Sequence, residues 1–226
     1  MRRNLRFWTR FTWEYVGAEL IMVGIFLLVG LFSSDWIWAD GVSGLMDFLA
    51  LFPFYLIIAA ILIVMMTGPG VQTLYIPLLV SCGEPRKNVF WGMQYHRFLM
   101  IAATSLICAA VWGLVPSEIS DAGLQCLPVI IAVLVIISAF GGLMGAAYVR
   151  WKWLGILIIL VFFGGFGGLV GWLFTSDRLG FGDMALAVEN LSGFSLPWLV
   201  AAVAAVLLAV ELSVLWLTLR RHEVRL

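Results

Sequence analysis

Long apolar runs separated by short polar connections make up most of this sequence. A helix needs about 20 mostly apolar residues to cross the hydrocarbon core of a bilayer, and lipid cannot satisfy the polar backbone of an open segment. Each run is therefore expected to be a helix. The four runs without a charged residue are 48–66, 98–115, 127–149 and 153–174, and the two that carry a single glutamate are 15–32 and 196–219.

These runs predict an all-α integral membrane protein, a single transmembrane domain that covers 1–226. Lysine and arginine gather before the first span, between the second and third, between the fourth and fifth, and after the sixth, whereas the other loops are mostly acidic. Because positively charged loops stay on the cytoplasmic side, this asymmetry predicts both termini in the cytoplasm. The six spans are placed at 15–32, 45–66, 93–115, 127–149, 153–174 and 196–219.

Composition agrees with a membrane location. Hydrophobic residues make up 63% of the chain and charged residues 12%, whereas a soluble domain is nearer half apolar and a quarter charged. The lipid bilayer is therefore the expected surrounding, and a net charge of zero gives no reason to expect a nucleic-acid partner. A cleaved signal peptide is the alternative for the first span, but Glu14 and Glu19 do not fit one. The three cysteines show neither a paired nor a metal-binding pattern.

The first fourteen residues mix arginine with large apolar side chains. Arg2, Arg3, Arg6 and Arg10 are interspersed with leucine, phenylalanine and tryptophan. This composition favours an amphipathic helix over 1–14 that lies in the cytoplasmic interface, with its cations near anionic headgroups. The alternative is a simple basic flank that sets the orientation of the first span.

The longest cytoplasmic connection lies between the second and third spans. The Gly-Pro-Gly sequence at 68–70 is expected to end the second span. Residues 71–83 are then apolar but too short to cross the bilayer, and Gly83 suits a helix C-terminus. Glu84 is expected to cap the next helix, with Pro85 at its first position. A short apolar helix of this kind must either lie on the bilayer or dock on a partner protein.

The stretch from Ile76 to Gly92, IPLLVSCGEPRKNVFWG, resembles a segment of the membrane subunits of ABC-2-type transporters. In that family a short apolar helix runs into a Gly-x-x-Arg-Lys turn, then an aromatic pair and glycine, between spans two and three. The resemblance implies that 71–83 is a coupling helix that docks on a separate ATPase subunit. The residues that it assigns to this coupling are Leu78, Leu79, Gly83, Arg86 and Lys87.

The same resemblance implies the wider function. The chain would form half of the translocation path of an exporter in a bacterial cytoplasmic membrane, together with a second, identical or homologous membrane subunit. No G-x-x-x-x-G-K-[ST] motif occurs, so ATP and Mg would be bound by the partner ATPase. A re-entrant helical pair is expected in the outer loop 175–195, with a plain surface loop as the alternative. The expected cargo is an amphipathic peptide, antibiotic or lipid.

Two glutamates, Glu19 and Glu211, fall inside the predicted spans. Charged groups inside a membrane are costly and usually face water or the interior of a bundle. They are therefore the candidates for a substrate path, in which they would contact a cationic part of the cargo. The alternative is that Glu19 reaches the interface and Glu211 bonds to a neighbouring helix.

Glycines at helical spacing occur in the fourth and fifth spans. Such spacing permits close approach of helix backbones, so the two spans are expected to pack tightly against each other. The glycines concerned are Gly141, Gly145, Gly164, Gly168 and Gly171.

Two other functional classes stay open as alternatives. An ion-coupled secondary transporter would also use a helical bundle, although no convincing internal repeat is present. An intramembrane aspartyl protease is suggested by the Gly-Phe-Gly-Asp sequence ending at Asp183, with Asp47 as the second carboxylate that this chemistry needs. His96 and His222 are interpreted as interfacial side chains, and no metal site is predicted.

Overall fold

The computed structural model describes residues 2–33, 41–153, 156–157, 160–161, 164–165 and 195–221. Within these residues the chain is helical and has no β-strand, which confirms the predicted all-α class. The elements are α1 (Arg2–Ser33), α3 (Val42–Ala50), α4 (Phe52–Gly70), the π-helical turn η1 (Val71–Tyr75), α5 (Ile76–Ser81), α6 (Arg86–Leu114), α7 (Glu118–Arg150) and α10 (Ser195–Arg221).

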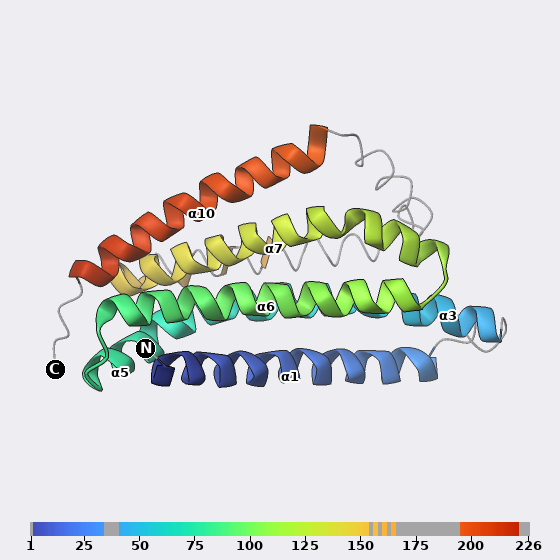
Figure 1. Cartoon of the computed structure of the whole chain (residues 1–226), viewed down its shortest axis with the longest axis horizontal. Helices are drawn as coiled ribbons and strands as arrows, with labels where there is room; N and C mark the ends of the chain where they lie inside the picture. The colour runs from blue at the N-terminus through green and yellow to red at the C-terminus, as the bar shows by residue number, and fades with distance from the viewer. Residues whose placement is uncertain are drawn as a thin grey trace.

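The long helices run back and forth along one bundle (Figure 1). Helix α7 packs against α4, α6 and α10, and α6 also packs against α1 and α4. Helix α1 begins and α10 ends at the same end of the bundle (Figure 1). Most of the predicted fifth span, 153–174, and of the outer loop, 175–195, lies outside the described residues.

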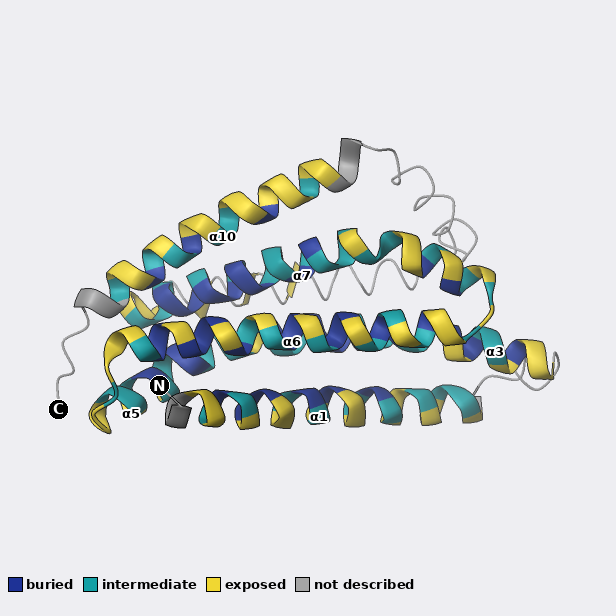
Figure 2. Ribbon diagram, viewed as in Figure 1, coloured by how far each residue is buried: buried dark blue, intermediate teal, exposed yellow. Residues whose placement is uncertain are grey.

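Five helical segments among the described residues are long and apolar enough to cross a membrane. Exposed positions follow the outward faces of α1 and α10 (Figure 2) and include large apolar side chains such as Ile21, Phe26 and Val206. A protein in water would cover so much apolar surface. The lengths, composition and surface are those of a multi-pass membrane protein. The five segments are Leu5–Phe32, Val42–Ser81, Arg86–Leu114, Glu118–Arg150 and Trp198–Thr218.

The N-terminal segment differs from the prediction. In place of a separate interfacial helix over 1–14, α1 is one unbroken helix of 32 residues. Trp8, Phe11 and Val16 lie on the side of this helix that faces the protein, and all three are buried. Trp8 and Phe11 pack in one cluster with side chains of η1, α5 and α6. The aromatic residues thus find their apolar surroundings inside the protein, and the prediction of a separate helix is wrong.

The Gly-Pro-Gly sequence at 68–70 does not end the second span, contrary to the prediction. Helix α4 passes through the proline and continues as η1 and α5, so the apolar segment 71–83 is joined to the span. The N–H of Ile76 bonds to the carbonyl oxygen of Val71, five residues earlier. Pro69 lacks the N–H that would bond to residue 65, and the helix continues past this missing bond into the wider π-helical turn.

The second span is interrupted at its other end. The sequence predicts one helix over 45–66, but α3 ends at Ala50 and α4 begins at Phe52, with Leu51 as the turn between them. Pro53 lies in the first turn of α4, where its missing N–H costs nothing.

The turn after α5 follows the prediction at Gly83 and is shifted by one residue at Pro85. Gly83 has a φ of 86°, a conformation that favours glycine. Its N–H bonds to the carbonyl oxygen of Val80, and the N–H of Glu84 bonds to that of Leu79, the pattern of a helix closed by a left-handed residue. Pro85 has a ψ of 134° and precedes α6 as its cap instead of occupying the first helical position.

The glycines of α7 pack against α4. A Cβ on Gly145 would lie 2.9 Å from the carbonyl oxygen of Gly68, and a Cβ on Gly68 would overlap the backbone of Gly141. By contrast, a Cβ on Gly164 would have no neighbour within 4 Å in the described part of the chain. Among the described residues, the close glycine contact therefore joins α7 to α4, where the sequence prediction had joined the fourth span to the fifth. Two of the predicted packing residues lie outside the described residues, Gly168 and Gly171.

Candidate functional site

Polar side chains from several helices meet inside the bundle around a small cavity. The cavity has a volume of about 30 Å³, enough for roughly two water molecules. It lies between the end of α4 with η1, the first half of α6, the middle of α7 and the second half of α10. Its main polar lining residues are Gln72, Gln94, His96, Arg97, Ser138 and Glu211.

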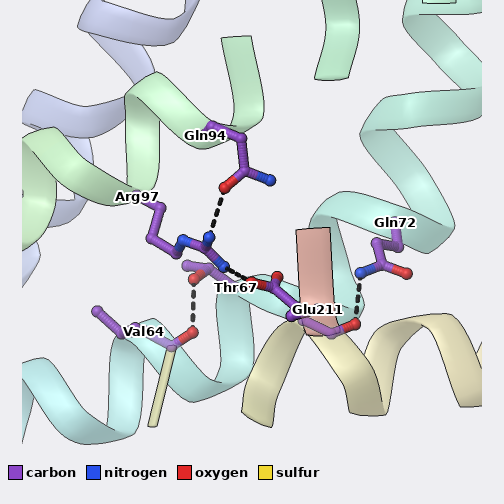
Figure 3. Close-up of polar contacts among 7 residues, drawn as sticks. Val64, Thr67, Gln72, Gln94, Arg97 and Glu211 are labelled. Carbon is purple, nitrogen blue, oxygen red and sulfur yellow. Dashed lines mark hydrogen bonds and ion pairs between the residues drawn. The ribbon is translucent and has the colours of Figure 1, made fainter. Parts of the chain in front are cut away.

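Arg97 of α6 and Glu211 of α10 form an ion pair beside this cavity (Figure 3). The Glu211 side chain is completely buried, and 11% of the Arg97 side chain is exposed. Arg97 also donates a hydrogen bond to Oε1 of Gln94, one turn earlier on α6. Since two charges held in apolar surroundings depend on each other, removal of either partner would leave a costly unpaired charge.

The absence of a side chain at Gly142 of α7 leaves space for the carboxylate of Glu211. A Cβ at this position would overlap Oε1 of Glu211. The carbonyl oxygen of Gly142 also accepts a hydrogen bond of 2.7 Å from Nε2 of Gln72, the second residue of η1. One glycine of α7 is therefore in contact with both the π-helical turn and the ion pair.

Three buried polar atoms around the cavity have no hydrogen-bond partner among the described residues. They are Oε1 of Glu211, Nε2 of Gln94 and Oγ of Ser138. The residues that carry them are at most 3% exposed and line the cavity. Buried polar atoms are nearly always paired with protein groups or water, so these three mark the cavity as a place for a polar occupant. The set contains an acceptor, a donor and a hydroxyl that can do both.

His96 joins the cavity to α1. Nδ1 of His96 lies 2.8 Å from the Thr12 hydroxyl, which donates its own proton to the carbonyl oxygen of Trp8. This pattern assigns the ring proton to Nδ1, with Nε2 left as an acceptor. His96 is 3% exposed and packs edge-on against Phe11, with ring centroids 4.8 Å apart. His96 was expected to be an interfacial side chain, but the structure buries it on the face of α6 that packs against α1.

Glu19 lies apart from this cavity. Its side chain is buried on α1, and the Thr104 hydroxyl of α6 donates a hydrogen bond of 3.1 Å to its Oε2. It does not line the cavity, so the structure does not bring Glu19 and Glu211 together on one path. Nor does Glu19 reach the interface, the alternative considered from the sequence. Of the two glutamates, only Glu211 reaches the cavity, and its charge is already matched by Arg97.

The residues assigned to coupling lie at one end of the bundle, where α5 turns into α6 (Figure 1). Gly83 is exposed in the turn, and Arg86 and Lys87 are exposed at the start of α6. Leu78 is 56% exposed, whereas Leu79 is partly buried and packs against the cluster that contains Trp8. Exposed apolar and basic side chains thus occur side by side at this tip.

The sequence reasoning missed Arg97, Gln94, Gln72 and Ser138. The sequence analysis treats Arg97 only as one of the cytoplasmic charges that orient the third span, because it directly precedes the charge-free run that begins at 98. The spacing of Met93, Arg97 and Met100 could have revealed it, because it places the arginine on the same helix face as two apolar residues and so indicates burial.

Other chemical sites receive no support from the described residues. No group of three or more histidine, cysteine, aspartate or glutamate side chains that could hold a metal ion occurs in the described part of the chain. Asp47 lies on α3, and Asp183 lies outside the described residues. Comparison of the chain with protein-family models, with curated proteins and with solved structures finds no match in any of the three.

Proposed function

We propose that this chain is the membrane-spanning subunit of an ATP-driven exporter of the ABC-2 type. The observation that carries the proposal is the exposed tip formed by α5, the turn at Gly83 and the start of α6, in which Leu78 and the basic pair Arg86 and Lys87 face outward. An apolar side chain beside two cations, at the end of two long helices, is suited to docking on an acidic groove of a partner protein.

The tip is also placed to transmit movement. On one side it continues through η1 into α4, and on the other it begins α6. Both helices line the cavity that holds the Arg97–Glu211 ion pair. A displacement of the tip by an ATPase would therefore reach the polar centre of the bundle through two continuous helices. The joined helix replaces the free-standing coupling helix expected over 71–83.

The remaining parts of the proposal follow from the same assignment. ATP and Mg are bound by a separate ATPase subunit, because the sequence contains no phosphate-binding motif of the Walker type. A second membrane subunit, identical or homologous, completes the path across a bacterial cytoplasmic membrane. The cargo is an amphipathic peptide, antibiotic or lipid.

Affinity capture of the tagged protein from its native membrane tests this function. An ATPase should co-purify with the natural chain and be lost from the Arg86→Glu/Lys87→Glu variant. The matched control is Arg150→Glu/Lys152→Glu, which reverses two exposed charges at the connection after α7 and should retain the ATPase. Capture without any ATPase, from membranes in which the protein is folded, would remove the assignment.

An ion-coupled carrier is the second candidate, favoured by the π-helical turn beside a buried polar cavity. Carriers of this class place their sites at interruptions of transmembrane helices. Transport that stops on addition of a protonophore and continues after ATP depletion would favour the carrier. The reverse result would favour the exporter.

A further inference from the structure

The Arg97–Glu211 contact is the one buried ion pair among the described residues. It lies in largely apolar surroundings, since the cavity walls also include Val64, Met93 and Met100. The positively charged partner belongs to α6 and the negatively charged partner to α10. The two charges are thus carried by separate helices that could part without breaking either one.

The cavity lining also carries polar atoms that have no partner among the described residues. Nε2 of Gln94 is a donor without a partner, and the same amide contacts Arg97 through its oxygen. On the other side, Oε1 of Glu211 is an acceptor without a partner, and Oγ of Ser138 is also unpaired. An anionic group entering the cavity would find Arg97 with the Gln94 amide. A primary ammonium would find Glu211, and the Ser138 hydroxyl lines the same cavity.

The charge of the ligand follows from the cost of separating the pair. A ligand with one charge could pair with Arg97 or with Glu211, but it would leave the other buried and unpaired, which is strongly unfavourable. A ligand with both charges would replace the internal pair and leave neither unmatched. We propose that this cavity is the binding site for the headgroup of a zwitterionic amphiphile. The anionic group of the ligand pairs with Arg97 in place of Glu211, and its ammonium group pairs with Glu211 in place of Arg97.

The apolar part of the ligand has a place beside the same pair. Met93 and Met100 flank Arg97 on α6 and line the cavity, and methionine adapts readily to different apolar shapes. The cavity in this structure has room for only about two water molecules, so the headgroup enters when α10 moves away from α6. Helix α10 packs chiefly along α7, and its packing on α6 is slight. This inference rests on the proposed transport function and specifies the class of its cargo as a lipid-like zwitterion.

Three probes with acyl or alkyl chains of similar length test the site in a non-ionic detergent. They are lysophosphatidylethanolamine, with both charges, lysophosphatidylglycerol, with the anion alone, and a long-chain primary alkylammonium, with the cation alone. Dissociation constants are measured by microscale thermophoresis on the purified chain. We expect the zwitterion to bind at least tenfold more tightly than either singly charged probe. Equal binding of the three probes would overturn the proposal.

Variants of the pair give a second, independent result. Glu211→Gln should shift the preference toward the anionic probe, and Arg97→Gln toward the cationic probe. The double variant Arg97→Gln/Glu211→Gln buries no charge and should lose at least tenfold in zwitterion affinity while remaining folded. Neutralising the exposed pair by Arg10→Gln/Glu14→Gln is the matched control and should change nothing. Zwitterion binding that persists in the double variant would overturn the proposal.

The binding experiment uses neither ATP nor a partner subunit, so its failure is separate from failure of the exporter assignment. Captured ATPase with equal binding of all probes would reject only the zwitterion site. Selective zwitterion binding without any captured ATPase would reject only the exporter.

Discussion

The indole of Trp8 in α1 lies directly against Gly92 in α6, in space that any side chain at 92 would fill. Trp8 is completely buried, and its ring packs edge-on against Phe7 and Phe11. The contact fixes the start of α1 against the start of α6, beside the tip that we propose as a docking surface. It also explains why α1 is continuous, since its first turns have a partner inside the protein.

Gly92→Ala should destabilise the bundle by about 1–3 kcal/mol, the usual cost of overpacking a tightly filled site. The Trp8 ring cannot move aside because it is enclosed on all sides. The measurement is thermal unfolding of the detergent-solubilised protein. The matched control is Gly113→Ala in the same helix, where a Cβ would meet nothing within 4 Å, and that variant should be neutral or slightly stabilised. Similar unfolding temperatures for the two variants would contradict the packing described.

Gly68→Ala should cost about 3 kcal/mol, near the upper end of overpacking effects. Its Cβ would overlap the carbonyl group of Gly141, so two helix backbones would have to separate. Gly70→Ala, two residues later, is the control, because a Cβ there has no neighbour within 4 Å and the backbone is helical with φ −61°. If the second span ended at 68–70, as the sequence predicted, without close packing of Gly68 on α7, the two substitutions would have equal effects on unfolding.

Arg97→Gln and Glu211→Gln should each destabilise the protein by about 3–5 kcal/mol, because each leaves one buried charge without its partner. The double variant removes both charges and should recover most of that loss. Chemical unfolding of the four proteins in the same detergent gives the coupling energy of the pair. Additive losses in the double variant would show that the two side chains do not interact.

The cysteines report which end of the bundle faces the cytoplasm. Cys82 is exposed at the tip, Cys108 is buried, and Cys126 is partly exposed near the start of α7. A membrane-impermeant maleimide should label a chain that keeps only Cys82 in inside-out vesicles, and not in intact cells. A chain that keeps only Cys126 should show the opposite pattern. Labelling of both cysteines from one side would contradict the predicted orientation.

Much of the fold could be predicted because it depends on single residues. Apolar runs long enough to cross a bilayer predicted the helices. The turn at Gly83 was predicted because glycine tolerates the positive φ that ends a helix. The errors at 1–14 and 68–70 have one origin. Local signals for an interface helix and a helix stop were overridden by packing, since Trp8 and Gly68 both have close partners on neighbouring helices.

The sequence by itself determined that the chain is an all-helical membrane protein and roughly where its helices lie, because each residue contributes to the transfer of a segment into lipid almost independently. Only the tertiary structure decided that Arg97 pairs with Glu211, 114 positions later. The same holds for the glycines of α7, which leave space for the backbone of α4 and for the carboxylate of Glu211. A transmembrane helix is apolar on all sides, so its hydrophobic pattern carries little information about which face it turns to a neighbour. That rotation is set by the fit of side chains between helices, which no single segment contains.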